Sequence, residues 1–142
     1  MSLLTDIVSR LTADASVAAL VGSRVRVNRS AQGDALPRIV ITQVSGDHEH
    51  HLTGASGFVQ GRIQIDCHAV YPYLADNLSE AVRQSLDGFN GLMGSTPVST
   101  MHLSEERTIS TPPNPGGGDA EGVETKQTDY TVGWTVSIPT FN

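Results

Sequence analysis

The clearest alternation of apolar and polar residues lies between Ile63 and Ala69, where every second residue is apolar. A period of two predicts a β-strand with one buried face. Pro72 follows closely, and behind it apolar residues recur at three- and four-residue spacing as far as Leu86. This spacing predicts an amphipathic helix, which Gly88 ends. Because the connection is so short, we expect the helix to fold back onto the apolar face of the sheet.

The N-terminal part of the chain carries two helical patterns and two strand patterns. An apolar stripe predicts a helix over Ser2–Leu11, capped by its first residue, and Asp14 can cap a second short helix over Ala15–Val21. These two segments are either separate helices or one broken helix. Alternation then predicts strands over Arg24–Arg29 and Arg38–Ser45.

The segment Asp47–Phe58 separates two predicted strands and is polar and rich in Gly and His. We interpret the two strands as a long antiparallel hairpin whose outer part is this segment. It has no apolar face to lay on a core, so we expect it to project past the core. A projecting segment of this kind either binds a partner or stays mobile.

The C-terminal part alternates between irregular and strand-like segments. Phe89–Thr96 reads as a Gly-punctuated connector, Val98–Thr111 as a weak strand, and Thr111–Val123 as a flexible Pro- and Gly-rich loop. Tyr130–Ile138 alternates clearly and predicts a last strand. The whole order predicts a single α+β domain over residues 1–142, with two layers: a mostly antiparallel β-sheet with helices packed on one face, and a long projecting β-hairpin.

The amino-acid composition and the net charge exclude some classes of function. The chain has 142 residues, only 38% of them hydrophobic, with 14 Gly and 7 Pro, so its core is thin and assembly with other subunits could supply further burial. A net charge of −6 argues against gripping nucleic acid by its phosphates. Its one cysteine, Cys67, excludes an intrachain disulfide and reads as a small buried hydrophobe. We find no membrane-length apolar run and no signal peptide, and expect a soluble cytosolic product.

The most conspicuous candidate for chemistry is a run of acids and histidines at the hairpin tip. It consists of Asp47, His48, Glu49, His50 and His51. Such side chains can bind zinc or nickel, but the spacing lacks the His-Glu-x-x-His pattern of a helical metal site. On a strand, two of the histidines share a face and offer only a weak two-ligand site. A native metal site, an adventitious surface site and a solvated loop or subunit contact all stay open, and the pattern favours the last.

Asp66 and His68 share a face of the central strand and could form an acid–base pair, but no nucleophile motif stands near them. Gly116–Gly118 lacks the flanking residues of a phosphate-binding loop. The sequence therefore predicts no catalytic, cofactor-binding or metal-binding residue and no cofactor. The candidate residues are interface residues, namely Asp47, His48, Glu49, His50, His51, Arg62, Asp66, His68, Pro112, Pro113 and Pro115.

Four short motifs, spread over residues 3 to 136, resemble a known family. Asp14–Val25 is similar to a "D-x-x-V-x-x-L-V-G-x-R-V" start and Leu36–Ile41 to a "P-x-I-V" strand. Arg62–Cys67 is similar to an "x-I-Q-I-D" strand, and Ala75–Leu86 to the helix that follows it. In this order and spacing they resemble the tail-completion proteins of long-tailed bacteriophages, which are related to tail terminators and head–tail joining proteins.

This resemblance implies a six-fold homo-oligomeric ring at the head-proximal end of the virion tail, assembled in the host cytoplasm. The ring would cap the tail-tube protein and bind the head connector or stopper protein. DNA would pass through without specific binding, and no membrane or cofactor is involved. Two alternatives remain: another neck or minor tail adaptor protein, or a metal-dependent enzyme built on His48, His50 and His51 with Asp66 and His68.

Overall fold

The computed structural model describes residues 2–29, 35–113 and 122–140, which form three helices and six strands. The helices are α1 (Leu3–Ala13), α2 (Ala15–Val21) and α3 (Pro72–Leu86). The strands are β1 (Val25–Val27), β2 (Arg38–His51), β3 (Gly54–Ala69), β4 (Gly91–Met93), β5 (Thr96–Thr111) and β6 (Val123–Thr135). No helix of the described residues is long and apolar enough to cross a membrane.

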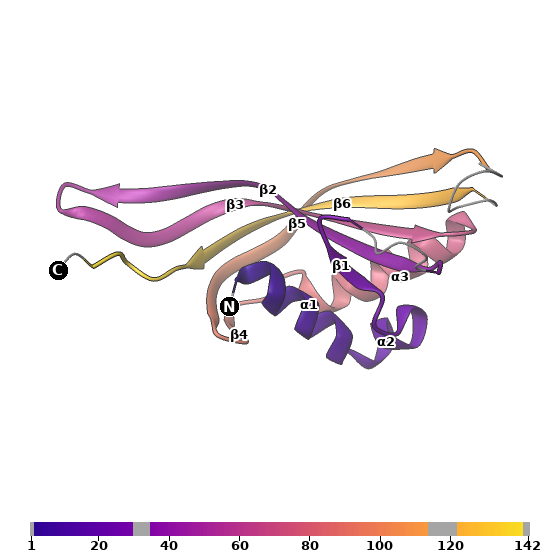
Figure 1. Cartoon of the computed structure of the whole chain (residues 1–142), viewed down its shortest axis with the longest axis horizontal. Coiled ribbons are helices and arrows are strands. Elements are labelled where there is room, and N and C mark those ends of the chain that lie inside the picture. The colour runs from indigo at the N-terminus through magenta and orange to yellow at the C-terminus, as the bar shows by residue number, and fades with distance from the viewer. Residues whose placement is uncertain (1, 30–34, 114–121, 141–142) are drawn as a thin grey trace.

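All six strands belong to one sheet, in the order β1-β2-β3-β6-β5-β4. The short β1 pairs with β2 in parallel, and every other neighbouring pair is antiparallel. The sheet is strongly twisted, and the helices gather on one face of its middle part (Figure 1). These observations confirm the predicted α+β class, with a mostly antiparallel sheet covered by helices on one side.

The core lies between the helices and the central strands. Ile63, Ile65 and Cys67 of β3 have no exposed surface, while the polar residues between them are partly accessible. Leu78 and Val82 of α3 are equally buried against them. The predicted strand and helix therefore meet through their apolar faces, and this packing orients the rest of the sheet.

Asp14 separates the first two helices. Its backbone N–H donates to the carbonyl oxygens of Arg10 and Leu11 at the end of α1. Its side chain accepts from the backbone N–H groups of Ser16 and Val17, at 2.9 and 3.2 Å, which starts α2. Because one residue ends one helix and caps the next, the two segments are separate helices.

The sheet has two exposed parts, at opposite ends of the molecule (Figure 1). On one side β2 and β3 extend as the hairpin arm, residues 44–58, in which all of β2 is exposed. On the other side the outer half of β5, residues 104–111, is exposed along its whole length next to β6. The long projecting hairpin is therefore confirmed.

Three expected boundaries were wrong. The Gly-punctuated connector contains β4, and its last residue, Thr96, is the first residue of β5. The last strand begins at Val123 and ends at Thr135, so Val136 and Ile138 lie beyond it. Because Thr111 pairs with Val123, the loop of the expected segment 111–123 shortens to residues 112–122. Its residues 114–121 lie outside the described residues.

Candidate assembly surfaces

The hairpin arm is held by backbone pairing rather than by burial. Its strands stay in antiparallel register out to His51 opposite Gly54, with a two-residue turn of Leu52 and Thr53 between them. The acid and histidine side chains of residues 47–51 are exposed, and so is Leu52 at the turn. A two-stranded ribbon without a buried face is only marginally stable in water, so the arm is suited to contact another molecule.

Two facing glycines shape the base of the arm. Gly46 lies opposite Gly61, next to an irregularity between Gln43 and Ser45. A Cβ atom on Gly61 would overlap the carbonyl oxygen of Ser45, so the two backbones approach more closely than any other residue allows. The N–H of Arg62 donates to the Ser45 hydroxyl at 3.2 Å. This close approach fixes the direction in which the arm leaves the sheet.

The segment after β6 supports the arm from one side. The N–H of Val136 donates to the carbonyl oxygen of Gly57 at 2.7 Å. Gly57 has a φ of 87°, and a Cβ there would meet Val136 and Ile138 at 3.0 and 3.1 Å. The C-terminal segment accordingly runs beside the arm (Figure 1), and it leaves the Ile138 side chain 55% exposed.

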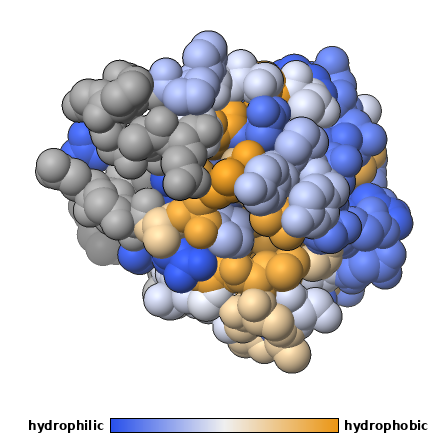
Figure 2. All heavy atoms as spheres, turned by 90° about the vertical axis from the view of Figure 1, so that its right-hand side faces the viewer, coloured by the Kyte–Doolittle hydropathy of each residue, from blue (hydrophilic) through white to orange (hydrophobic). Residues whose placement is uncertain are grey.

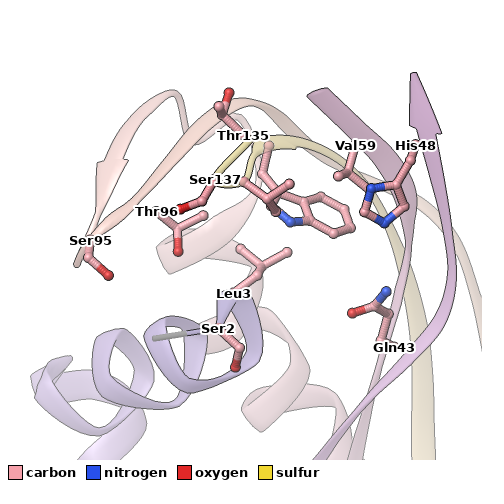
Figure 3. Close-up of a pocket in the computed structure, with 11 residues that line it drawn as sticks. Ser2, Leu3, Gln43, His48, Val59, Ser95, Thr96, Thr135 and Ser137 are labelled. Carbon is pink, nitrogen blue, oxygen red and sulfur yellow. The ribbon is translucent and has the colours of Figure 1, made fainter. Parts of the chain in front are cut away.

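A hollow of about 470 Å³ lies where the arm meets the start of α1. Figure 3 shows His48 and Gln43 reaching into it from β2, opposite Leu3 of α1 and Ser2, the residue that caps this helix. Trp134 of β6 also lines the hollow but is only 4% exposed. The hollow is open to solvent and bordered by polar groups, which suits an inserted side chain or loop better than a buried small molecule.

The tip histidines do not assemble a metal site. Within the described residues, no group of three or more His, Cys, Asp or Glu side chains is placed to hold a metal ion. The register between the two arm strands also shifts between His48 and His50. A closed structural zinc site has four protein ligands, which the described side chains of the tip do not bring together.

The face of the sheet opposite the helices is polar. Arg62, Gln64, Asp66 and His68 alternate along β3 on this face, as the pattern predicted. The Gln64 amide donates to both carboxylate oxygens of Asp66 at 3.3 Å. His68 Nδ1 lies 2.7 Å from the Thr125 hydroxyl on β6. Asp66 and His68 thus have hydrogen-bond partners along and across the sheet, in Gln64 and Thr125 respectively.

Asp129 of β6 lies between two arginines on this polar face. Its Oδ2 is 3.9 Å from Arg62 on β3 and 3.4 Å from Arg107 on β5, and its side chain is 3% exposed. Arg107 also donates to the Gln127 amide oxygen. A buried carboxylate needs such partners, because desolvation otherwise disfavours its charge. The Arg–Asp–Arg group therefore joins three strands through one shared carboxylate.

The titratable groups of the core are not activated for chemistry. Burial, followed by the nearby charge of Asp66, raises the pKa of the Cys67 thiol well above its usual value. Burial likewise raises the pKa of the Tyr130 hydroxyl. A nucleophilic thiol requires a lowered pKa and access to substrate, so Cys67 is a structural residue.

The predicted interface residues fall into separate places. Arg62, Asp66 and His68 share the polar face, whereas the 47–51 tip lies at the end of the hairpin arm. Pro112 and Pro113 are exposed after the end of β5, on the opposite side of the molecule (Figure 1). Pro115 lies outside the described residues. The structure does not test whether any of them contacts a partner, so their interface role stays a prediction.

Sequence reasoning missed an exposed aromatic pair where α3 begins. Tyr71 and Tyr73 flank Pro72 and stack with ring centroids 5.8 Å apart, 55% and 62% exposed. Figure 2 views the molecule from this end and shows apolar atoms reaching the surface between hydrophilic ones. The Tyr-Pro-Tyr sequence was the available signal, because two aromatic residues flank the proline that opens the helix.

Comparisons with known proteins identify a family and a solved structure that this chain resembles. A family model described as "Tail completion protein gp17" matches residues 5–107. No curated protein matches the chain. A chain of the solved "Virion of native gene transfer agent (GTA) particle" is 16% identical, with a TM-score of 0.67 over 95% of this chain and 96% of that chain. At this identity, the structural match establishes a shared fold.

Proposed function

Because the chain belongs to the tail completion protein gp17 family, we propose that its subunits form a ring that completes a phage tail at its head-proximal end. Family membership makes the protein a structural virion component and not an enzyme. The ring, with six subunits as the resemblance implies, would cap the tail tube and join it to the head connector.

The observation that carries this proposal is the hairpin arm. Residues 44–58 extend past every helix, and the arm's β2 strand has no buried residue. Monomeric proteins rarely keep a long exposed ribbon, because its edge invites pairing with other chains. An assembly subunit uses such a ribbon to reach its neighbours, and the hollow beside His48 offers a place for a neighbour's loop.

The charges support a ring through which DNA passes. The chain carries a net charge of −6, and a bore that attracted phosphates would slow ejection. If the polar face lined the bore, Asp129 would hold Arg62 and Arg107 in ion pairs. Paired arginines attract the DNA backbone less than free ones, so DNA would slide past without specific binding.

The contacts with the tube and the connector are assigned to the two projecting parts. The hairpin arm reaches in one direction, and Pro112 and Pro113 after β5 reach in the other. Two partners on opposite sides of a ring require surfaces of this kind.

The test is assembly. We expect native mass spectrometry and sedimentation of the full chain with the tail-tube protein to give closed rings, and electron microscopy to find them on tube ends. The isolated subunit can be monomeric at low concentration, so the tube protein is part of the experiment. A protein that stays monomeric and leaves tubes uncapped contradicts the proposal. Labelled protein found elsewhere in the neck of virions would assign it to another adaptor position.

A further inference from the structure

The sheet has two open edges. β1 pairs with β2 only along Ile39–Ile41, and β4 pairs with β5 only along Thr96–Val98. Within the described residues no strand pairs with the outer side of β2 from Thr42 to His51. The same is true of β5 from residue 104 to Thr111.

The part of β5 just before its open edge is already occupied. The Gly88 N–H donates to the Met101 carbonyl oxygen at 2.7 Å, and the Leu103 N–H donates to the Asp87 carboxylate at 3.0 Å. The residues that follow α3 thus provide hydrogen-bond partners for the backbone of the β5 edge as far as Leu103. The edge beyond this point is left for a strand from outside.

We propose that the outer edge of β5 in one subunit pairs with the outer edge of β2 in a second copy of this chain. The inference rests on the ring proposed above and states how its neighbours join. The strand directions permit it: β2, β3, β6 and β5 alternate, so β5 and a neighbouring copy's β2 meet antiparallel. Because the two edges differ, the contact is head-to-tail, and such a contact gives a ring when its repeated rotation closes.

The register follows from the positions of the open segments. Within one subunit Thr42 and Glu105 lie at the same level, because they connect through Gln64 and Asp129 across the sheet. Bringing the two open segments side by side needs a shift of about six residues along the strands. The four long strands of one subunit lie about 4.8 Å apart and together span about 19 Å. If the strands are tilted by about 45° to the ring axis, the next subunit is displaced along the strand direction by about 19 Å as well, which is about six residues.

This register places two exposed apolar residues opposite each other. Val44 and Ile109 are 52% and 42% exposed in the subunit, and both lie on the polar face of the sheet beside Arg62 and Thr125 respectively. Pairing would bury them together, as cross-strand apolar pairs do in sheets. The same register sets Glu106 opposite Asp47, a like-charged pair that costs part of this gain.

The experiment uses full-length protein carrying Val44→Cys and Ile109→Cys, assembled with the tail-tube protein and oxidised. We expect a ladder of crosslinked oligomers on non-reducing gels that ends at the closed ring. Either single substitution should give no ladder, because a head-to-tail contact needs both residues. Val44→Cys with Leu92→Cys is the matched control, since Leu92 is 68% exposed on β4 but lies outside the proposed pairing. The buried Cys67 stays unreactive in all variants.

A second measurement keeps edge pairing separate from folding. Ile109→Lys puts a charge on the open edge and should weaken ring formation about tenfold or more with unchanged circular dichroism, whereas Leu92→Lys should not. Rings on tube ends without the crosslinked ladder overturn the edge pairing and leave the ring proposal intact. Absence of rings in the unmodified protein overturns both.

Discussion

The two ends of the β2–β3 hairpin share one hydrogen-bonding pattern and differ almost completely in burial. Beneath the helices, Ile41 and Ile65 face each other with no exposed surface. A few residues further along the same strands, His50 and Leu52 are exposed. Because backbone pairing alone stabilises a ribbon only marginally, the free energy of folding resides in the covered half. The uncovered half keeps its shape for a partner.

The largest effect should come from the covered half. Leu78→Ala removes a fully buried side chain of α3 and should lower the free energy of unfolding by about 2–5 kcal/mol. Leu52→Ala is the matched control at the arm tip and should change it by less than about 0.5 kcal/mol. Urea denaturation measures both. Equal losses of unfolding free energy in the two variants would contradict the proposed difference between the covered and uncovered halves.

A buried carboxylate under the helices should matter next. Asp6 of α1 is 2% exposed and accepts a hydrogen bond from the Thr96 hydroxyl, which ties the helix layer to the start of β5. Asp6→Ala leaves that hydroxyl without its charged partner and should cost about 1.5–3 kcal/mol. Asp47→Ala on the exposed arm is the comparison and should be nearly neutral in the same denaturation experiment. A neutral result at Asp6 would contradict its structural role.

The base of the arm offers a test at the border of the two halves. Gly61→Ala forces a Cβ against the Ser45 backbone and should cost about 1–3 kcal/mol. Gly46→Ala, directly opposite, meets only the movable end of the Gln43 side chain at 2.8 Å and should cost less. Thermal unfolding ranks the two variants. If Gly46→Ala were the more damaging, the assigned close approach would be wrong.

The smallest effect is expected at the tip. His50 is exposed and belongs to no described metal-binding group, so His50→Ala should change the free energy of unfolding by less than about 0.5 kcal/mol. Denaturation with and without added zinc measures this. A large loss, or strong stabilisation of the unmodified protein by zinc, would give the tip a metal-binding role.

The sequence was informative wherever one face of an element is buried. β3 and α3 were predicted closely, because Ile63, Ile65 and Leu78 repeat at the spacing their burial requires. The interface residues could be nominated only by exclusion. Partner contacts leave no periodic signal in the chain that makes them, so the interface role of Asp66 and His68 stays a prediction. Within the subunit these two side chains bond to Gln64 and Thr125.

The predicted strand boundaries were wrong where burial produces no periodic pattern of apolar residues in the sequence. β4 has three residues, and two of them, Gly91 and Leu92, are exposed, so nothing in the sequence announces a strand there. Its structure depends on pairing with β5. β6 begins earlier than expected because its residues 124–129 are polar and pair between β3 and β5, which a local pattern cannot reveal.

We propose that the hairpin arm and the outer half of β5 are assembly surfaces attached to a core that folds without them. Hydrogen–deuterium exchange of the subunit, alone and assembled with the tail-tube protein, distinguishes these surfaces from the core. We expect amides of residues 44–58 and 104–111 to exchange quickly in the free subunit and to become protected on assembly. Amides of Ile63–Cys67 should be protected in both states. Assembled particles in which the arm still exchanges as fast as in the free subunit would contradict the claim.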